Sequence, residues 1–181
     1  MPAFDARCWV AVAAVCVPIP AHATQYLSIE QAQRLLFPQA ERFVASPVRL
    51  SAELRSRIAA ESGVTSRRDE QPVWKAMRGD AALGFLVLDE VIGKHELITY
   101  AVALETNGSV RGVEILDYRE SRGGEVRDAR WRAQFLGKRA GDTLRIDQDI
   151  QNLSGATLSS RHITDGVRRI LALHKLVLSG R

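Results

Sequence analysis

The strongest local indication of structure lies near the middle of the chain, in Leu97-Ile-Thr-Tyr-Ala-Val-Ala-Leu-Glu105, Thr106-Asn-Gly-Ser109 and Val110-Arg-Gly-Val-Glu-Ile-Leu-Asp-Tyr118. The first and third segments are apolar runs of strand length, and the third places Val113 and Ile115 on one face. The Asn-Gly pair between them predicts a type I′ turn, because both central residues of that turn need positive φ. We therefore expect an antiparallel hairpin.

Further elements are expected on both sides of this hairpin. Ala82 to Val91 is apolar and rich in β-formers, which predicts another strand. Downstream, Asp128–Phe135 is expected to form a short helix with Trp131 and Phe135 one turn apart, and Leu144–Ile146 a brief strand. The last element is the clearest helix, because its apolar residues keep 3- and 4-residue spacing: Ile163, Val167, Ile170, Leu171, His174 and Leu178.

The N-terminal part of the chain is expected to be mainly helical. Helical spacing runs from Ser28, the expected N-cap, to Phe37, and a second short helix is expected over Leu50–Ala60, starting at Ser51. A polar loop is expected at Thr65–Pro72. Helices, then strands, then a helix predict one α+β domain, with an antiparallel sheet packed with helices.

The composition suits one globular domain. The chain has 181 residues, of which 46% are hydrophobic and 25% charged. This composition excludes collagen-like repeats, a disulfide scaffold and polar low-complexity sequence. The formal net charge of +4 is modest and comes without a basic cluster, so nucleic acid is not an expected partner.

Residues 1–23 are expected to be a cleaved signal peptide. The uncharged run Cys8–Pro20 is too short to span a bilayer, which takes about 20 apolar residues. Ala21-His22-Ala23 offers small residues at both positions that a signal peptidase recognises. Cleavage there would remove both cysteines and place the mature protein in the periplasm. Two alternatives stay open: a buried N-terminal helix, and a lipoprotein anchored at Cys16, which the preceding valine disfavours.

The segment before the last helix brings hydroxyls and small residues to a helix N-terminus: Asp149-Ile-Gln-Asn-Leu-Ser-Gly-Ala-Thr-Leu-Ser-Ser160. There the first backbone N–H groups lack intrahelical partners and the helix dipole is positive, so the position suits a phosphate. Gly155 and Ala156 would let a bulky group approach the backbone. The alternative, which spacing alone favours, is that Ser159 or Ser160 simply caps the helix.

Ser154-Gly-Ala-Thr-Leu-Ser-Ser160, with an aspartate five residues before its first serine, resembles the flavinylation motif of the FMN-binding domain family. This family includes the periplasmic C subunit of the sodium-translocating NADH:quinone reductase and the G subunit of the Rnf electron-transport complex. The resemblance implies that Thr157 carries FMN through a phosphoester. A flavin transferase would install it, taking FMN from FAD and releasing AMP. The resemblance also implies cofactor contacts from Ser154, Gly155, Ala156 and Ser159.

A second block is similar to the same family: Arg119-Glu-Ser-Arg-Gly-Gly-Glu-Val126, then Trp131, Phe135 and Gly137-Lys138. In the family, a Glu, a Gly-containing loop and an aromatic helix help to enclose the flavin. Here the Glu is not followed by the family's Thr-Pro-Gly, and Arg119 stands where those subunits often have His. The block implies contributions to the FMN site from Glu120, Gly123, Gly124, Trp131 and Lys138.

The leading hypothesis is a periplasmic electron-transfer flavoprotein that relays electrons to or from a membrane or periplasmic redox partner. The resemblance covers roughly Gly84–Leu173, so residues 81–181 are taken as the FMN-binding domain and 24–80 as an N-terminal helical region. Two alternatives are a non-redox exported binding module, in which Ser154–Ser160 only caps a helix, and a stand-alone reductase. No catalytic residue is assigned, and the histidines lack metal-ligand spacing.

Overall fold

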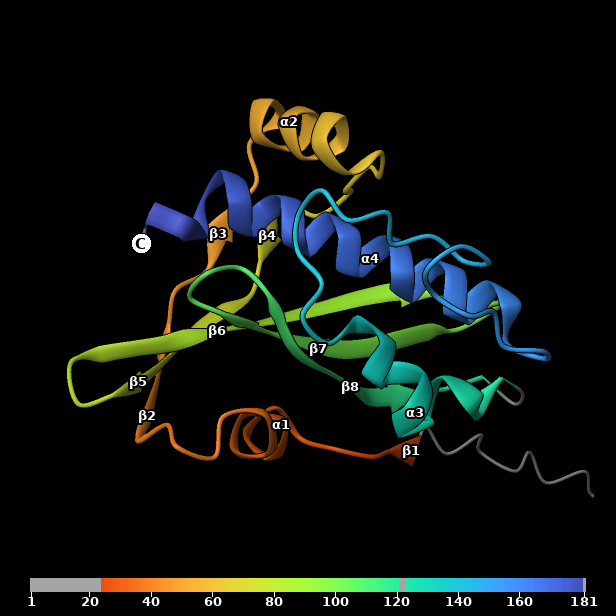
Figure 1. The fold of residues 1–181 in the computed structure, drawn as a ribbon, viewed down its shortest axis with the longest axis horizontal. Helices are drawn as coiled ribbons and strands as arrows, with labels where there is room; N and C mark the ends of the chain where they lie inside the picture. The colour runs from red at the N-terminus through yellow and green to blue at the C-terminus, as the bar shows by residue number, and fades with distance from the viewer. Residues whose placement is uncertain (1–23, 121–122, 181) are drawn as a thin grey trace, which may run out of the picture.

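A computed structural model describes residues 24–120 and 123–180, and a six-stranded antiparallel sheet lies at its centre (Figure 1). The strand order is β1-β8-β7-β6-β5-β2. These strands are β1 Thr24–Gln25, β2 Arg42–Ala45, β5 Val73–Arg78, β6 Ala81–Ile92, β7 Leu97–Glu105 and β8 Val110–Tyr118. A separate two-stranded sheet pairs β3 (Val48–Arg49) with β4 (Glu70–Gln71).

Helices cover both faces of the large sheet. α4 (Thr157–Leu176) crosses one face, α1 (Ile29–Leu36) covers the other, and α2 (Ala52–Ser62) packs on α4 (Figure 1). α3 (Ala129–Arg132) lies beside β8. Short 3₁₀ turns occupy Gly124–Arg127, Ala133–Phe135 and Leu178–Gly180. This layering confirms the predicted α+β class with an antiparallel sheet packed with helices.

The central hairpin forms over the predicted ranges, but through a different turn. Gly108 has a φ of +83°, whereas Asn107 is not in the positive-φ region. Gly108 N donates to Glu105 O at 2.9 Å, and Glu105 N donates to Ser109 O at 2.8 Å. This is the pattern of a three-residue loop with a type I turn and a left-handed glycine, so the predicted type I′ turn is wrong. Asn107 Oδ1 accepts from Ser109 N at 2.9 Å, which holds the loop closed.

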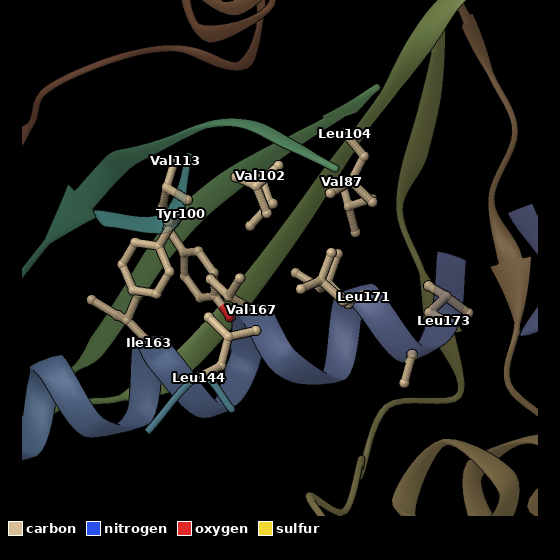
Figure 2. Packing of buried hydrophobic residues seen from close by; sticks show 14 of the residues in the cluster. Val87, Tyr100, Val102, Leu104, Val113, Leu144, Ile163, Val167, Leu171 and Leu173 are labelled. Carbon is tan, nitrogen blue, oxygen red and sulfur yellow. The ribbon is translucent and has the colours of Figure 1, made fainter. Parts of the chain in front are cut away.

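Two apolar clusters lie on opposite faces of the sheet. In the larger one, α4 directs Ile163, Val167 and Leu171 toward the strands (Figure 2), which confirms the predicted apolar stripe. In the smaller one, Leu36 of α1 packs with Leu86 of β6. Its neighbour in β6, Val87, belongs to the larger cluster. β6 therefore contributes side chains to both clusters, as a central strand does.

A buried polar cluster fixes the position of α4 on the sheet. Tyr100 Oη donates to Asp89 Oδ2 at 2.6 Å, and Arg169 of α4 pairs with the same oxygen at 2.5 Å. Asp89 is 0% exposed, and burial raises the pKa of Tyr100, so its hydroxyl stays a donor. A Cβ on Gly166 would lie 1.8 Å from Tyr100 Oη. The helix can therefore approach this hydroxyl only at a residue without a side chain.

Gly166→Ala is expected to lower the free energy of unfolding by about 1–3 kcal/mol, because overpacking outweighs the gain in helix propensity. Urea denaturation followed by circular dichroism measures the change. Gly180→Ala is the matched control, since no heavy atom lies within 4 Å of a Cβ there. Equal unfolding midpoints for the two variants would contradict the packing described.

His174 lies under the hairpin loop, with 5% of its surface exposed. Its Nδ1 would be 2.6 Å from a Cβ on Gly108, and its ring meets Phe85 edge-on at 5.8 Å. Burial lowers the pKa of His174, and a hydrogen bond with the Thr106 backbone only partly opposes this. The folded state therefore favours the neutral imidazole.

Stability is expected to fall as the pH drops below about 6.5, because the unfolded chain then binds a proton that folded His174 resists. Urea titrations at several pH values between 5 and 8 measure the slope. His174→Gln is expected to flatten this slope, because it removes the buried imidazole. If the slope of the unfolding free energy against pH is the same in His174→Gln as in the wild type, His174 is not the group that causes it.

The two N-terminal helices begin where the sequence predicts. Ser28 Oγ accepts from Gln31 N, and Ser51 Oγ accepts from Leu54 N, both at 3.2 Å. α2 continues two residues beyond the expected Ala60 and ends at a left-handed glycine. These outcomes follow from local capping, which depends on residues only three positions apart.

Other expectations need correction. Leu144–Ile146 forms no strand: Leu144 has a φ of +40°, and Ile146 makes only an isolated bridge with Ile150. The expected polar loop at residues 65–72 contains β4. Residues 24–80, expected to be mainly helical, supply β1, β2 and β5 to the main sheet as well as two helices.

The expected signal peptide, residues 1–23, lies outside the described residues. Within the described residues, none of the helices is long and apolar enough to cross a membrane.

Candidate functional site

α4 begins at Thr157 without a side-chain cap. Its N-cap residue is Ala156, whose methyl group cannot accept a hydrogen bond, and the preceding Gly155 has a φ of +86°. The alternative in which Ser159 or Ser160 caps the helix is wrong, because both lie inside the helix with 4% and 0% exposed. The positive end of a 20-residue helix therefore offers its first N–H groups without a side-chain acceptor.

The Thr157 side chain is exposed at this helix end. Its Oγ1 donates to Leu153 O over 3.5 Å, which is a weak contact. Within residues 24–120 and 123–180, no carboxylate or imidazole is hydrogen-bonded to this hydroxyl. A threonine hydroxyl is a weak nucleophile until a base or metal activates it, so activation has to come from another molecule.

The glycine loop of the second block lies against the start of α4. Gly123 has a φ of +87°, and a Cβ on it would lie 2.5 Å from Tyr118 Oη and 3.4 Å from Ala156 Cβ. Burial raises the pKa of Tyr118, whereas its hydrogen bond with Ser159 of α4 lowers it. The structure thus brings together the two sequence blocks that were singled out separately.

Glu120 supports a neighbouring turn. Its Oε1 accepts from His95 N at 2.5 Å and from Glu96 N at 3.0 Å, in the connection between β6 and β7. Burial disfavours the Glu120 carboxylate, but these backbone hydrogen bonds outweigh it and lower its pKa. Gly124 begins the 3₁₀ turn, where a Cβ would be 3.0 Å from the Arg127 side chain.

Trp131 is 3% exposed and is held by two contacts. Its Nε1 donates to Gln151 O at 2.8 Å, and its ring meets Phe135 edge-on with centroids 5.2 Å apart, which confirms the predicted pair. Trp131 and Leu153 line a cavity of about 340 Å³. Because Leu153 O accepts from Thr157, this cavity adjoins the start of α4.

Lys138 pairs with Asp149, the aspartate five residues before the serine-glycine motif. Lys138 Nζ lies 2.9 Å from Asp149 Oδ2, and the carboxylate also accepts from Leu144 N at 3.0 Å and Arg145 N at 2.8 Å. Burial disfavours the carboxylate, but these bonds outweigh it and lower the pKa of Asp149. Asp149 therefore holds the loop that leads into α4, including the left-handed Leu144.

Residues 93–172 match the model of the FMN-binding domain. This segment is an FMN-binding domain. The match lies within the range 81–181 expected from sequence, it contains both blocks described above, and it assigns FMN as the cofactor.

The crystal structure of Shewanella oneidensis NqrC is similar in fold. It superposes with a TM-score of 0.53 at 17% sequence identity, covering 75% of this chain and 80% of that chain. No match is found among curated proteins. At this identity the likeness concerns the fold alone.

The start of α4 fits the phosphate of FMN. The uncapped N–H groups and the exposed Thr157 hydroxyl are donors suited to a phosphate, and a Cβ on Gly155 would meet only Glu125 Oε1, at 3.8 Å. When bound, FMN supplies the redox chemistry of its isoalloxazine ring. Of the expected contacts, five come together at this helix end: Ser154, Gly155, Ala156, Thr157 and Ser159.

Gly123 touches this helix end, whereas Glu120, Trp131 and Lys138 make the supporting contacts described above. Sequence reasoning did not assign Tyr118 or Glu125 to the site. Neither has a spacing that would indicate it, because Tyr118 reaches Ser159 and Glu125 reaches Gly155 only through the tertiary fold. Among the described residues, no group of three or more His, Cys, Asp or Glu could hold a metal ion.

Asp149→Ala is expected to lower the free energy of unfolding by about 1–3 kcal/mol, because it leaves two backbone N–H groups and an ammonium without their acceptor. Lys138→Met removes only a partly exposed ion pair and should cost about 0–1 kcal/mol. Urea denaturation of both variants measures the difference. An equal loss in the two variants would mean that Asp149 acts only through the ion pair.

Proposed function

We propose that this chain is a periplasmic electron-transfer flavoprotein with FMN linked to Thr157 by a phosphoester. The observation that carries the proposal is the exposed hydroxyl of Thr157 at the uncapped start of α4, within an FMN-binding domain. The neighbouring Ser159 and Ser160 are buried, so they are poorly placed to react with another protein. Exposure thus favours Thr157 over these two serines as the acceptor.

The attachment step requires a separate flavin transferase and FAD. Thr157 Oγ1 would form a bond to the phosphorus of the FMN half of FAD, the diphosphate P–O bond would break, and AMP would leave. The hydroxyl proton would pass to a base on the transferase, since the described part of this chain places no acid or imidazole on Oγ1. After attachment, the N–H groups at the start of α4 would hold the phosphate oxygens.

The chain is proposed to act as an electron-transfer component rather than as a stand-alone enzyme. Its partner would be a redox protein in the periplasm or at the membrane, and the fold shared with NqrC is consistent with this role. Export would depend on the expected signal peptide at residues 1–23. A covalent link would keep the cofactor on the protein in a compartment where free flavin is lost.

Co-expression with a flavin transferase tests the proposal by intact mass. The wild-type chain should gain the mass of one FMN minus one water, because the ester forms with loss of water overall. Thr157→Ala should lack this adduct, whereas the control Ser154→Ala, at an exposed hydroxyl of the same motif, should keep it.

An adduct that survives in Thr157→Ala would reject the attachment site. A colourless, unmodified wild-type chain would instead favour the non-redox binding module. Turnover of NAD(P)H by the flavinylated chain alone would support a stand-alone reductase.

A further inference from the structure

A second cleft, of about 430 Å³, opens between three segments: residues 64–68, the end of β6 at residues 90–92, and α4 from His162 to Arg169. His162 comes five residues after Thr157, or about 7.5 Å further along the helix axis. Its Nδ1 lies 2.5 Å from Ile92 O and joins α4 to the end of β6. The cleft is thus a neighbour of the FMN site, and it shares no lining residue with it.

The walls of this cleft are tied together by arginines. Arg169 Nη1 donates to Thr65 O at 3.5 Å, while its Nη2 pairs with buried Asp89. On the facing loop, Arg68 Nη2 pairs with Glu90 of β6 at 2.5 Å. These contacts join the loop at residues 64–68 to both the helix and the sheet, so the cleft is preformed.

Of the three arginines that line the cleft, one has no acidic partner among the described residues. The two acidic residues of the cleft, Glu90 and Asp165, are already paired with arginines. Arg67 is exposed and forms no ion pair within the described ranges. Arg169 Nε is buried and has no hydrogen-bond partner there. A bound anion would compensate the charge of Arg67.

The lining also has an apolar part, beside the polar residues Thr65 and Ser66. Val64, Val91 and Ile92 contribute hydrocarbon surface, and Ile92 is 59% exposed. Apolar surface with a few polar groups, in a volume of about 300–1,000 Å³, is typical of small-molecule sites. Inorganic phosphate would use the cations but not this apolar surface.

We propose that this cleft binds a small organic anion, with its carboxylate at Arg67 and an apolar, preferably aromatic, body against Val64, Val91 and Ile92. The volume favours a small molecule over an acidic peptide. None of its lining residues is among those assigned to the FMN site, so the proposal concerns a separate site.

The test is an NMR titration of the full chain with three probes: benzoate, its neutral analogue benzamide, and acetate. Benzoate is expected to shift the amide signals of Val64, Val91 and His162 saturably, and to bind more tightly than either analogue. Arg67→Gln should weaken benzoate binding about tenfold through loss of a charge-assisted hydrogen bond. The control Arg57→Gln makes the same charge change at an exposed position on α2 and should leave binding unchanged.

Four results would overturn the proposal. These are absence of saturable shifts at the cleft, equal binding of benzoate and benzamide, equal effects of the two arginine variants, and displacement of benzoate by a lower concentration of a hexaglutamate peptide. The titration is repeated on the flavinylated chain. Binding retained there supports a separate site, whereas binding lost there would show that the flavin occupies the cleft and would also overturn the proposal.

Discussion

The position of α4 depends on one close contact, between the backbone at Gly166 and the hydroxyl of Tyr100. That hydroxyl donates to Asp89, which also pairs with Arg169 of the same helix and, at 3.6 Å from its Oδ1, with Arg68 Nε. Four polar groups therefore meet in an otherwise apolar interface. A buried charge needs its partners, and these partners exist only when the helix lies in this place. The contact therefore sets where the N-terminus of α4 emerges, and with it the position of Thr157.

The proposed FMN site is built from two kinds of contribution. The start of α4 supplies N–H groups, small residues and one exposed hydroxyl, which are the groups that can meet a phosphate. Supporting contacts come from elsewhere: Asp149 holds the loop before the helix, and Glu120 holds the turn between β6 and β7. Two charged residues of the family-like blocks, Asp149 and Glu120, are thus engaged in holding loops.

Patterns that depend on near neighbours in sequence were predictable, and those that depend on tertiary packing were not. The helix starts after Ser28 and Ser51 follow from capping, and the strands of the hairpin follow from their apolar runs.

The type of the hairpin turn does not follow from the Asn-Gly pair, because the side chain of Asn107 bonds to Ser109 and stabilises a longer loop. The apolar run predicts a strand at Leu144, but the contacts of Asp149 hold its backbone in a left-handed conformation. Tyr118 joins the site only because the fold brings β8 to α4.

The most direct test of the attachment site is tandem mass spectrometry of the flavinylated chain after trypsin digestion. Cleavage after Arg145 and Arg161 gives one peptide that contains all four candidate hydroxyls: Ser154, Thr157, Ser159 and Ser160. The account predicts that fragment ions place the FMN phosphoester on Thr157. A phosphoester located on any of the three serines, or a peptide without the modification, would contradict it.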